Sequence, residues 1–181
     1  MDRQAWLRGM ALLLLAHAVQ AGGFVVWSDE LSAGAFGPAQ EMNGFGCHGG
    51  NRSPRLEWSG APPATRSFAL TMFDPDARAG AGWWHWIVSD IPAFSHVMLA
   101  GNGDPARAAA KGMLQLRNDF GLLGYGGPCP PPGSRHHYRI VLSALKVAHL
   151  DVSATTTPAQ AAALIQGSAL GSAVLEAEFG R

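Results

Sequence analysis

SFALTMFDPDARAGAGWWHWIVSDI, residues 67–91, joins two predicted strands through an acidic turn that contains Asp74 and Asp76. Residues 67–73 form a nearly unbroken apolar run, which is typical of a strand covered on both faces. Residues 83–91 alternate, which predicts a second strand. Its two predicted faces are Trp83, His85, Ile87 and Ser89 on one side and Trp84, Trp86, Val88 and Asp90 on the other.

The rest of the chain repeats this pattern of short apolar segments between turns. Its 23 Gly and 12 Pro fall largely between apolar runs, which favours a turn-rich β fold over a helical bundle. One helix is predicted over residues 159–166, because Thr157, Pro158 and Gln160 form a capping box at its start. Gly167 is expected to stop it. Further strands are predicted over residues 24–27, 56–58, 136–147 and 173–179, with a loop over residues 43–54.

Length and composition narrow the class of protein. The 181 residues fit one compact domain, and 48% hydrophobic residues argue against a disordered chain. The 13 basic residues are balanced by 13 acidic ones, and only 14% of residues are charged. Binding to a phosphate backbone needs a surplus of Lys and Arg, so a nucleic-acid partner is not expected.

Residues 1–21 have the three parts of a secretory signal peptide. Arg3 and Arg8 precede a short apolar stretch, and Ala21 supplies a small residue at the end. The stretch is shorter than the roughly 20 residues that span a bilayer. The alternative is an N-terminal core helix. The sequence therefore predicts a periplasmic or secreted protein with a single domain over residues 22–181 and no transmembrane segment after cleavage.

Export affects how Cys47 and Cys129 are interpreted. In an oxidising compartment, two cysteines are expected to form a disulfide. The alternative is a nucleophilic or metal-binding thiol. Cys129 lies between Pro128 and Pro130, with no adjacent base or cation that would lower its pKa, so this alternative is weaker.

Acidic and imidazole side chains lie at the ends of several predicted strands. Two Asp follow the buried strand, one His begins the next strand, and another His begins the strand after residue 135. Taken singly, these are ordinary turn residues and packed histidines. If the strands are neighbours in a sheet, however, the groups converge within aromatic walls and suit a small anion. The predicted group is Asp74, Asp76, Trp83, His85, His136 and Tyr138.

Several motifs resemble the phosphatidylethanolamine-binding protein family, most closely its bacterial Raf-kinase-inhibitor-like branch of the YbhB/YbcL type. The family motifs are Asp-Pro-Asp-Ala at residues 74–77, Trp83-x-His85, Gly127-Pro128 and His136-x-Tyr138. Residues 45–54, 117–121 and 124–131 are similar to the bacterial branch in particular. The resemblance implies a mostly β protein, an antiparallel β-sandwich with few short helices.

The resemblance also implies a small pocket for phosphate, phosphorylated head groups and other small anions. The matching ligand-binding positions are Asp74, Asp76, Trp83, His85, Gly127, Pro128, His136 and Tyr138. The chain departs from the family pattern at Arg78-Ala79, where a proline usually follows the alanine, and at His137, where Arg is common. Arg78 is expected to add a cation near the pocket mouth. Some relatives inhibit kinases, but an exported protein does not meet a cytosolic kinase.

Three functions remain as hypotheses. The first is a non-catalytic binding protein without a cofactor, in which His85, His136 and the Gly127 N–H bind a phosphoryl or similar anion and a protein partner is inhibited or modulated. The second is a metal-dependent hydrolase with the ligands Asp74, Asp76, His85 and His136, although their spacing matches no compact metal motif. The third, a Ser or Cys nucleophile enzyme, lacks a Gly-x-Ser-x-Gly elbow. The binding protein is the preferred hypothesis.

Overall fold

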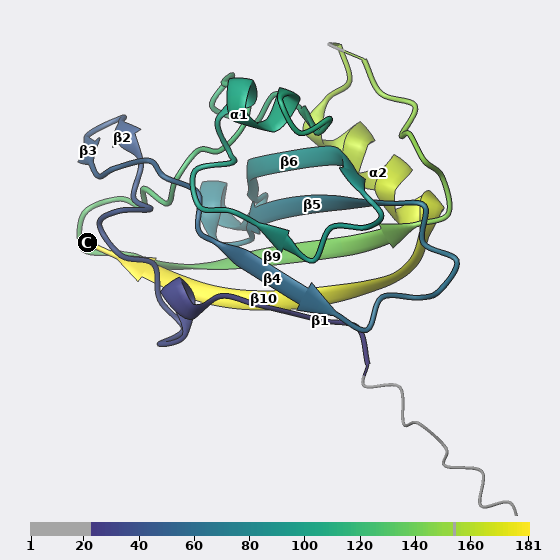
Figure 1. Cartoon of the computed structure of the whole chain (residues 1–181). Helices are drawn as coiled ribbons and strands as arrows, with labels where there is room; N and C mark the ends of the chain where they lie inside the picture. Colours follow the sequence, from purple (N-terminus) through teal and green to yellow (C-terminus); the bar gives the residue numbers. More distant parts are fainter. Residues whose placement is uncertain (1–22, 154) are drawn as a thin grey trace, which may run out of the picture.

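The computed structural model describes residues 23–153 and 155–181, and its architecture is mostly β with two short α-helices (Figure 1). The predicted signal peptide, residues 1–21, lies outside the described residues. The strands are β1 Val25–Trp27, β2 Asn43–Gly44, β3 Cys47–His48, β4 Leu56–Ser59, β5 Ser67–Asp74, β6 Trp83–Pro92, β7 Val97–Met98, β8 Leu114–Gln115, β9 Arg135–Leu145 and β10 Ala169–Gly180. The α-helices are α1 Pro105–Ala109 and α2 Pro158–Ser168, and short 3₁₀ helices span Asp29–Leu31 and Ala77–Gly80.

Antiparallel pairing arranges these strands into a five-stranded sheet, β10-β9-β5-β6-β8, and a three-stranded sheet, β1-β4-β7. The third sheet is a two-stranded hairpin of β2 and β3. The strand β5 is central, with β6 on one side and β9 on the other. The strands that carry the acidic turn and the two imidazoles are therefore neighbours, as predicted. The predicted fold class, mostly β and antiparallel, is also confirmed.

The main core lies between the two larger sheets. Trp58 and Leu56 of β4 pack there with buried side chains of the five-stranded sheet, such as Phe68, Trp86 and Leu142. On the opposite face of that sheet, a second core joins β5 and β6 to α2. Both faces of β5 are covered, which explains why its sequence is almost continuously apolar.

The helix α2 begins with the predicted capping box. The Thr157 side chain accepts a hydrogen bond from the Gln160 N–H, and the Gln160 side chain accepts one from the Thr157 N–H. The predicted stop at Gly167 is wrong, because the helix continues to Ser168 and passes directly into β10 with Ala169 in an extended conformation. No left-handed residue is needed at that junction, so glycine has no capping role there.

The predicted disulfide between Cys47 and Cys129 is confirmed, and their Cα atoms are 6.0 Å apart. It attaches β3 to the segment that precedes β9 across 82 residues of chain. The predicted loop over residues 43–54 therefore contains the hairpin β2–β3. In the described part of the chain, neither helix has the length and apolar character required to cross a membrane.

Replacing both cysteines tests how much this crosslink stabilises the fold. Closing a loop of this length restricts the unfolded chain, so we expect the Cys47→Ala/Cys129→Ala variant to lose about 4 kcal/mol of unfolding free energy. Urea unfolding of the oxidised wild type and the variant measures the difference. A reductant should lower the stability of the wild type alone. Equal stability of oxidised wild type and variant would contradict the stabilising role.

Candidate functional site

A cavity of about 210 Å³ opens where β5 ends and β6 begins, next to the start of β9. Four of the eight predicted ligand-binding residues line it, together with five further residues. The lining is Asp74, Ala77, Arg78, Trp83, His85, Phe120, Cys129, Pro131 and His136. The antiparallel order β9-β5-β6 brings the acidic turn and both imidazoles together at one end of these neighbouring strands.

Asp74, the last residue of β5, is the centre of the site. One carboxylate oxygen accepts hydrogen bonds from the N–H groups of Asp76 and Ala77, at 2.9 and 3.0 Å. The other lies 2.8 Å from Nδ1 of His136 and 3.8 Å from Nε2 of His85. Burial opposes ionisation of this carboxyl, but the contacts with the two imidazoles outweigh it and lower the pKa of Asp74.

His85 occupies a β-bulge on β6. Trp84 pairs with Phe73 and Trp86 pairs with Met72, so His85 is an extra residue with no partner on β5. A bulge re-aims the side chains around it. This corrects the predicted alternation: His85 faces the ring of Tyr138, whereas Ile87, expected on the same face, packs in the core beside α2.

The ring of His85 has a defined orientation. Its Nδ1 lies 2.9 Å from the Gly126 carbonyl oxygen and 3.1 Å from that of Gly127. Carbonyl oxygens only accept hydrogen bonds, so Nδ1 carries a hydrogen and Nε2 faces Asp74. The imidazole side chain is 3% exposed. His85 is therefore fixed by the two carbonyl groups and lines the cavity.

His136, the second residue of β9, is the more accessible imidazole, with 13% of its side chain exposed. Because the carboxylate of Asp74 is an acceptor, Nδ1 of His136 carries the hydrogen of their 2.8 Å contact. No described residue makes a hydrogen bond with Nε2. This nitrogen accepts a hydrogen bond when the ring is neutral and donates one when the ring is charged.

Aromatic side chains form the wall of the cavity. The ring of Phe120 lies 5.3 Å from that of Trp83, 5.2 Å from that of His85 and 5.1 Å from that of Phe45. Its backbone N–H donates to the buried side chain of Asn118. Sequence reasoning included Phe120 only in the motif at residues 117–121 and did not assign it to the site, since nothing nearby in sequence links it to His85.

Asp76, Gly127, Pro128 and Tyr138 do not line the cavity but support it. The Gly127 N–H donates to the side chain of Asn51 at 2.8 Å, so its predicted role as a donor to the ligand is wrong. The Pro128 carbonyl accepts from the Met42 N–H at 3.1 Å. Tyr138 is fully buried, with its ring 5.2 Å from that of His85.

Asp76 turns away from the cavity toward His137. The His137 N–H and Nδ1 lie 2.7 and 2.8 Å from one oxygen of Asp76. The backbone hydrogen bond, followed by that of the ring, lowers the pKa of Asp76, and the same carboxylate raises the pKa of His137. His137 therefore holds the acidic turn through its backbone and its ring.

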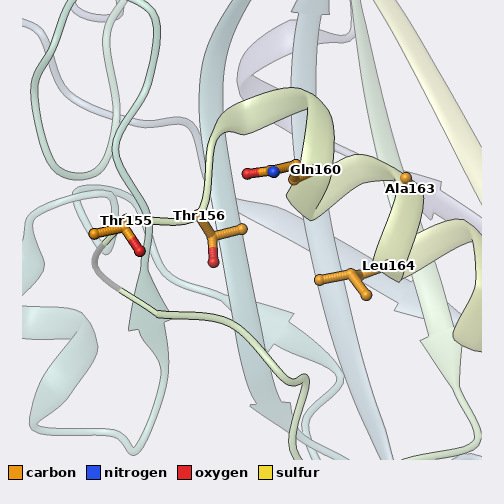
Figure 2. A pocket seen from close by; sticks show the side chains of 5 residues that line it. All are labelled: Thr155, Thr156, Gln160, Ala163 and Leu164. Carbon is orange, nitrogen blue, oxygen red and sulfur yellow. The ribbon is translucent and has the colours of Figure 1, made fainter.

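A larger hollow of about 550 Å³ lies beside the first half of α2, with side chains of Thr155, Thr156, Gln160, Ala163 and Leu164 around it (Figure 2). This lining contains no charged group and no imidazole, so it does not resemble an anion site. Among residues 23–153 and 155–181, no group of three or more His, Cys, Asp and Glu is arranged to hold a metal ion. The geometry thus gives no support to the hydrolase hypothesis.

Comparison with known proteins agrees with this fold. Residues 32–180 match the family model described as phosphatidylethanolamine-binding protein. The chain is 40% identical to Escherichia coli YbcL over 90% of each chain, and 41% identical to E. coli YbhB over 76% of this chain and 87% of that protein. The crystal structure of E. coli YbcL superimposes with a TM-score of 0.83 at 37% identity, over 88% of this chain and 99% of that one.

The fold and the site define an antiparallel β protein with a small cavity at the ends of the inner strands of its main sheet. The chain belongs to the phosphatidylethanolamine-binding protein family. Its similarity to YbcL and YbhB confirms the predicted bacterial branch. A further relative, the putative lipoprotein LppC of Mycobacterium tuberculosis, is 39% identical over 75% of this chain and 63% of that protein.

Asp74→Asn tests the charge at the centre of the site. The pKa of Asp74 is lower in the folded protein than in the unfolded chain, where it is about 3.9. The ionised carboxylate therefore stabilises the fold at any pH above that unfolded pKa. This stabilisation is lost as the pH falls through the folded pKa. We expect the variant to be about 1–3 kcal/mol less stable at pH 7. We also expect its stability to fall less than that of the wild type between pH 5 and pH 2.

Urea unfolding at several pH values measures both effects. Asp151→Asn is the matched control, because it makes the same change at an exposed carboxyl outside the cavity. The control should follow the wild type. If the Asp74→Asn variant and the wild type showed the same pH dependence, Asp74 would not be the stabilised carboxylate that its contacts indicate.

Proposed function

We propose that this chain is a non-catalytic binding protein whose cavity recognises a phosphoryl or similar anionic group on a small ligand. The observation that carries the proposal is the 2.8 Å contact between Nδ1 of His136 and Asp74. It leaves Nε2 of an accessible imidazole for a ligand. Membership in the phosphatidylethanolamine-binding protein family supports the same function.

The proton positions determine when an anion binds. With Nδ1 of His136 donating to Asp74, a neutral ring presents a lone pair at Nε2 and repels an anion. A charged ring presents an N–H there and forms a charge-assisted hydrogen bond with the anion. Asp74 orients this ring by accepting its Nδ1 hydrogen at 2.8 Å. Anion binding and protonation of His136 are therefore coupled.

The walls favour a small ligand group. Trp83 and Phe120 are in contact with each other and narrow the cavity beside the two imidazoles. Pro131 and the bonded Cys129 also line the cavity. The disulfide occupies the thiol that the nucleophile hypothesis would require. These features suit the binding of a small charged group within apolar walls, without a catalytic side chain.

The proposed location is outside the cytoplasm, in the periplasm or medium. Residues 1–21 have the composition of a signal peptide, and the bond between Cys47 and Cys129 is typical of an oxidising compartment. The name of LppC, putative lipoprotein, supports the same location. The ligand is accordingly proposed to be an extracytoplasmic one.

Sulfate titration tests the proposed function, because the charge of sulfate does not change between pH 6 and pH 8.5. Imidazoles change charge between about pH 5 and pH 8. We expect the affinity for sulfate, measured by calorimetry at constant ionic strength, to fall about tenfold or more from pH 6 to pH 8.5. The loss of one charge-assisted hydrogen bond is of this size.

His136→Gln should lose most of this affinity at pH 6 and show little pH dependence. The matched control is His149→Gln, which alters an exposed imidazole paired with Asp90 near the opposite end of β6. The control should bind sulfate as the wild type does. Absence of sulfate binding by the wild type at pH 6, or equal binding by His136→Gln, would contradict the proposal.

A further inference from the structure

We propose that Arg78 is a specificity-determining residue, which makes the cavity select a doubly charged phosphate monoester over a singly charged phosphate diester. The inference rests on the proposed function and assigns a ligand class to the same cavity. Arg78 directly follows the acidic turn of residues 74–77 and lines the cavity with Asp74.

The backbone around Arg78 adopts a costly conformation. Arg78 has φ 51° and ψ 46°, and Ala79 has φ 56° and ψ 37°. Both lie in the left-handed region, which costs a residue other than glycine roughly 1–2 kcal/mol. Such strain persists where the surrounding structure imposes it, and it clusters at functional sites. Here the turn is closed by the hydrogen bond from the Gly82 N–H to the Ala77 carbonyl, at 3.0 Å.

This turn brings the guanidinium of Arg78 to the cavity. Its central carbon lies 5.5 Å from the centre of the Trp83 ring, within the range of a cation–π contact. Arg78 and Trp83 both line the cavity. In the described part of the chain, no carboxylate forms an ion pair with Arg78. This contact positions the guanidinium while leaving its N–H groups available to an anion.

Arg78 also decides the sign of the charge in the cavity. It is the only Lys or Arg among the nine lining residues of the described chain, and Asp74 is the only carboxylate. The charge of ionised Asp74 cancels that of one imidazolium, so Arg78 leaves the lining net positive. When both imidazoles are neutral, Arg78 alone balances Asp74. Without Arg78, the lining would then repel an anion.

Two separate donors favour two negative charges on the ligand. A monoester dianion has three terminal oxygens that share its charge, so His136 and Arg78 can each bind a different one. Guanidinium groups suit such contacts because their donors form a planar fork. A diester has one negative charge, two terminal oxygens and a second substituent that the aromatic wall around Trp83 must accommodate. Arg78 therefore contributes more to binding of the monoester.

Calorimetric titration with methyl phosphate and dimethyl phosphate at pH 7 and low ionic strength tests this selection, because the monoester, with a second pKa of about 6, is already mainly a dianion there. The two probes differ in charge and by one methyl group. We expect the wild type to bind methyl phosphate more tightly. Arg78→Met should weaken methyl phosphate binding about tenfold and dimethyl phosphate binding about twofold, as expected for a charge-assisted contact at a partly open site.

Two further variants separate charge from folding. Arg78→Gly relieves the left-handed strain, so we expect it to unfold at the same or a higher temperature and still to lose the affinity for methyl phosphate. Arg66→Met is the matched control, since Arg66 is exposed next to the first residue of β5, at the far end of that strand from Asp74. It should bind both probes as the wild type does.

The outcomes distinguish this inference from the proposed function. If the wild type binds methyl phosphate and Arg78→Met binds it equally well, the role of Arg78 is overturned while the cavity remains an anion site. If Arg78→Met weakens both probes by the same factor, selection by charge is overturned. If the wild type binds neither probe, nor sulfate at pH 6, the proposed function itself fails.

Discussion

The buried carboxylate of Asp74 holds together the three segments that build the cavity. Its two oxygens accept from the turn that follows β5 on one side and face the imidazoles of β6 and β9 on the other. A buried charge without such partners would be costly. The same contacts orient His85 and His136, so the stability of the acidic turn and the chemistry of the cavity depend on one group.

The segment that leads to β9 has a second, less obvious role. The carbonyls of Gly126 and Gly127 take the Nδ1 hydrogen of His85, and two residues later Cys129 attaches the segment to β3. The glycines permit a close approach, since a Cβ at Gly127 would lie 2.1 Å from the carbonyl oxygen of Gln40. The disulfide therefore attaches a wall of the cavity to β3.

Much of the site was predictable because it rests on local patterns. The apolar run before Asp74 indicates a central strand, and strand ends place His85 and His136 at one edge of the sheet. Other features depend on tertiary structure. The bulge at His85 leaves no trace in an alternating sequence. The Gly127 N–H is occupied by Asn51, which lies 76 residues away in the sequence. Phe120 reaches the cavity through packing with Trp83. Glycine is a common residue at the end of a helix, but α2 continues past Gly167 and the chain passes directly into β10.

The central claim is that an anion binds at Nε2 of a charged His136 whose Nδ1 is held by Asp74. Nitrogen-15 NMR of the histidine rings, recorded at pH 7.5 with and without saturating sulfate, tests it most directly. The account predicts that sulfate shifts both ring nitrogens of His136 toward the values of a charged imidazole and leaves those of His149 unchanged. Unaltered His136 resonances under saturating sulfate, or equal shifts at both residues, would contradict it.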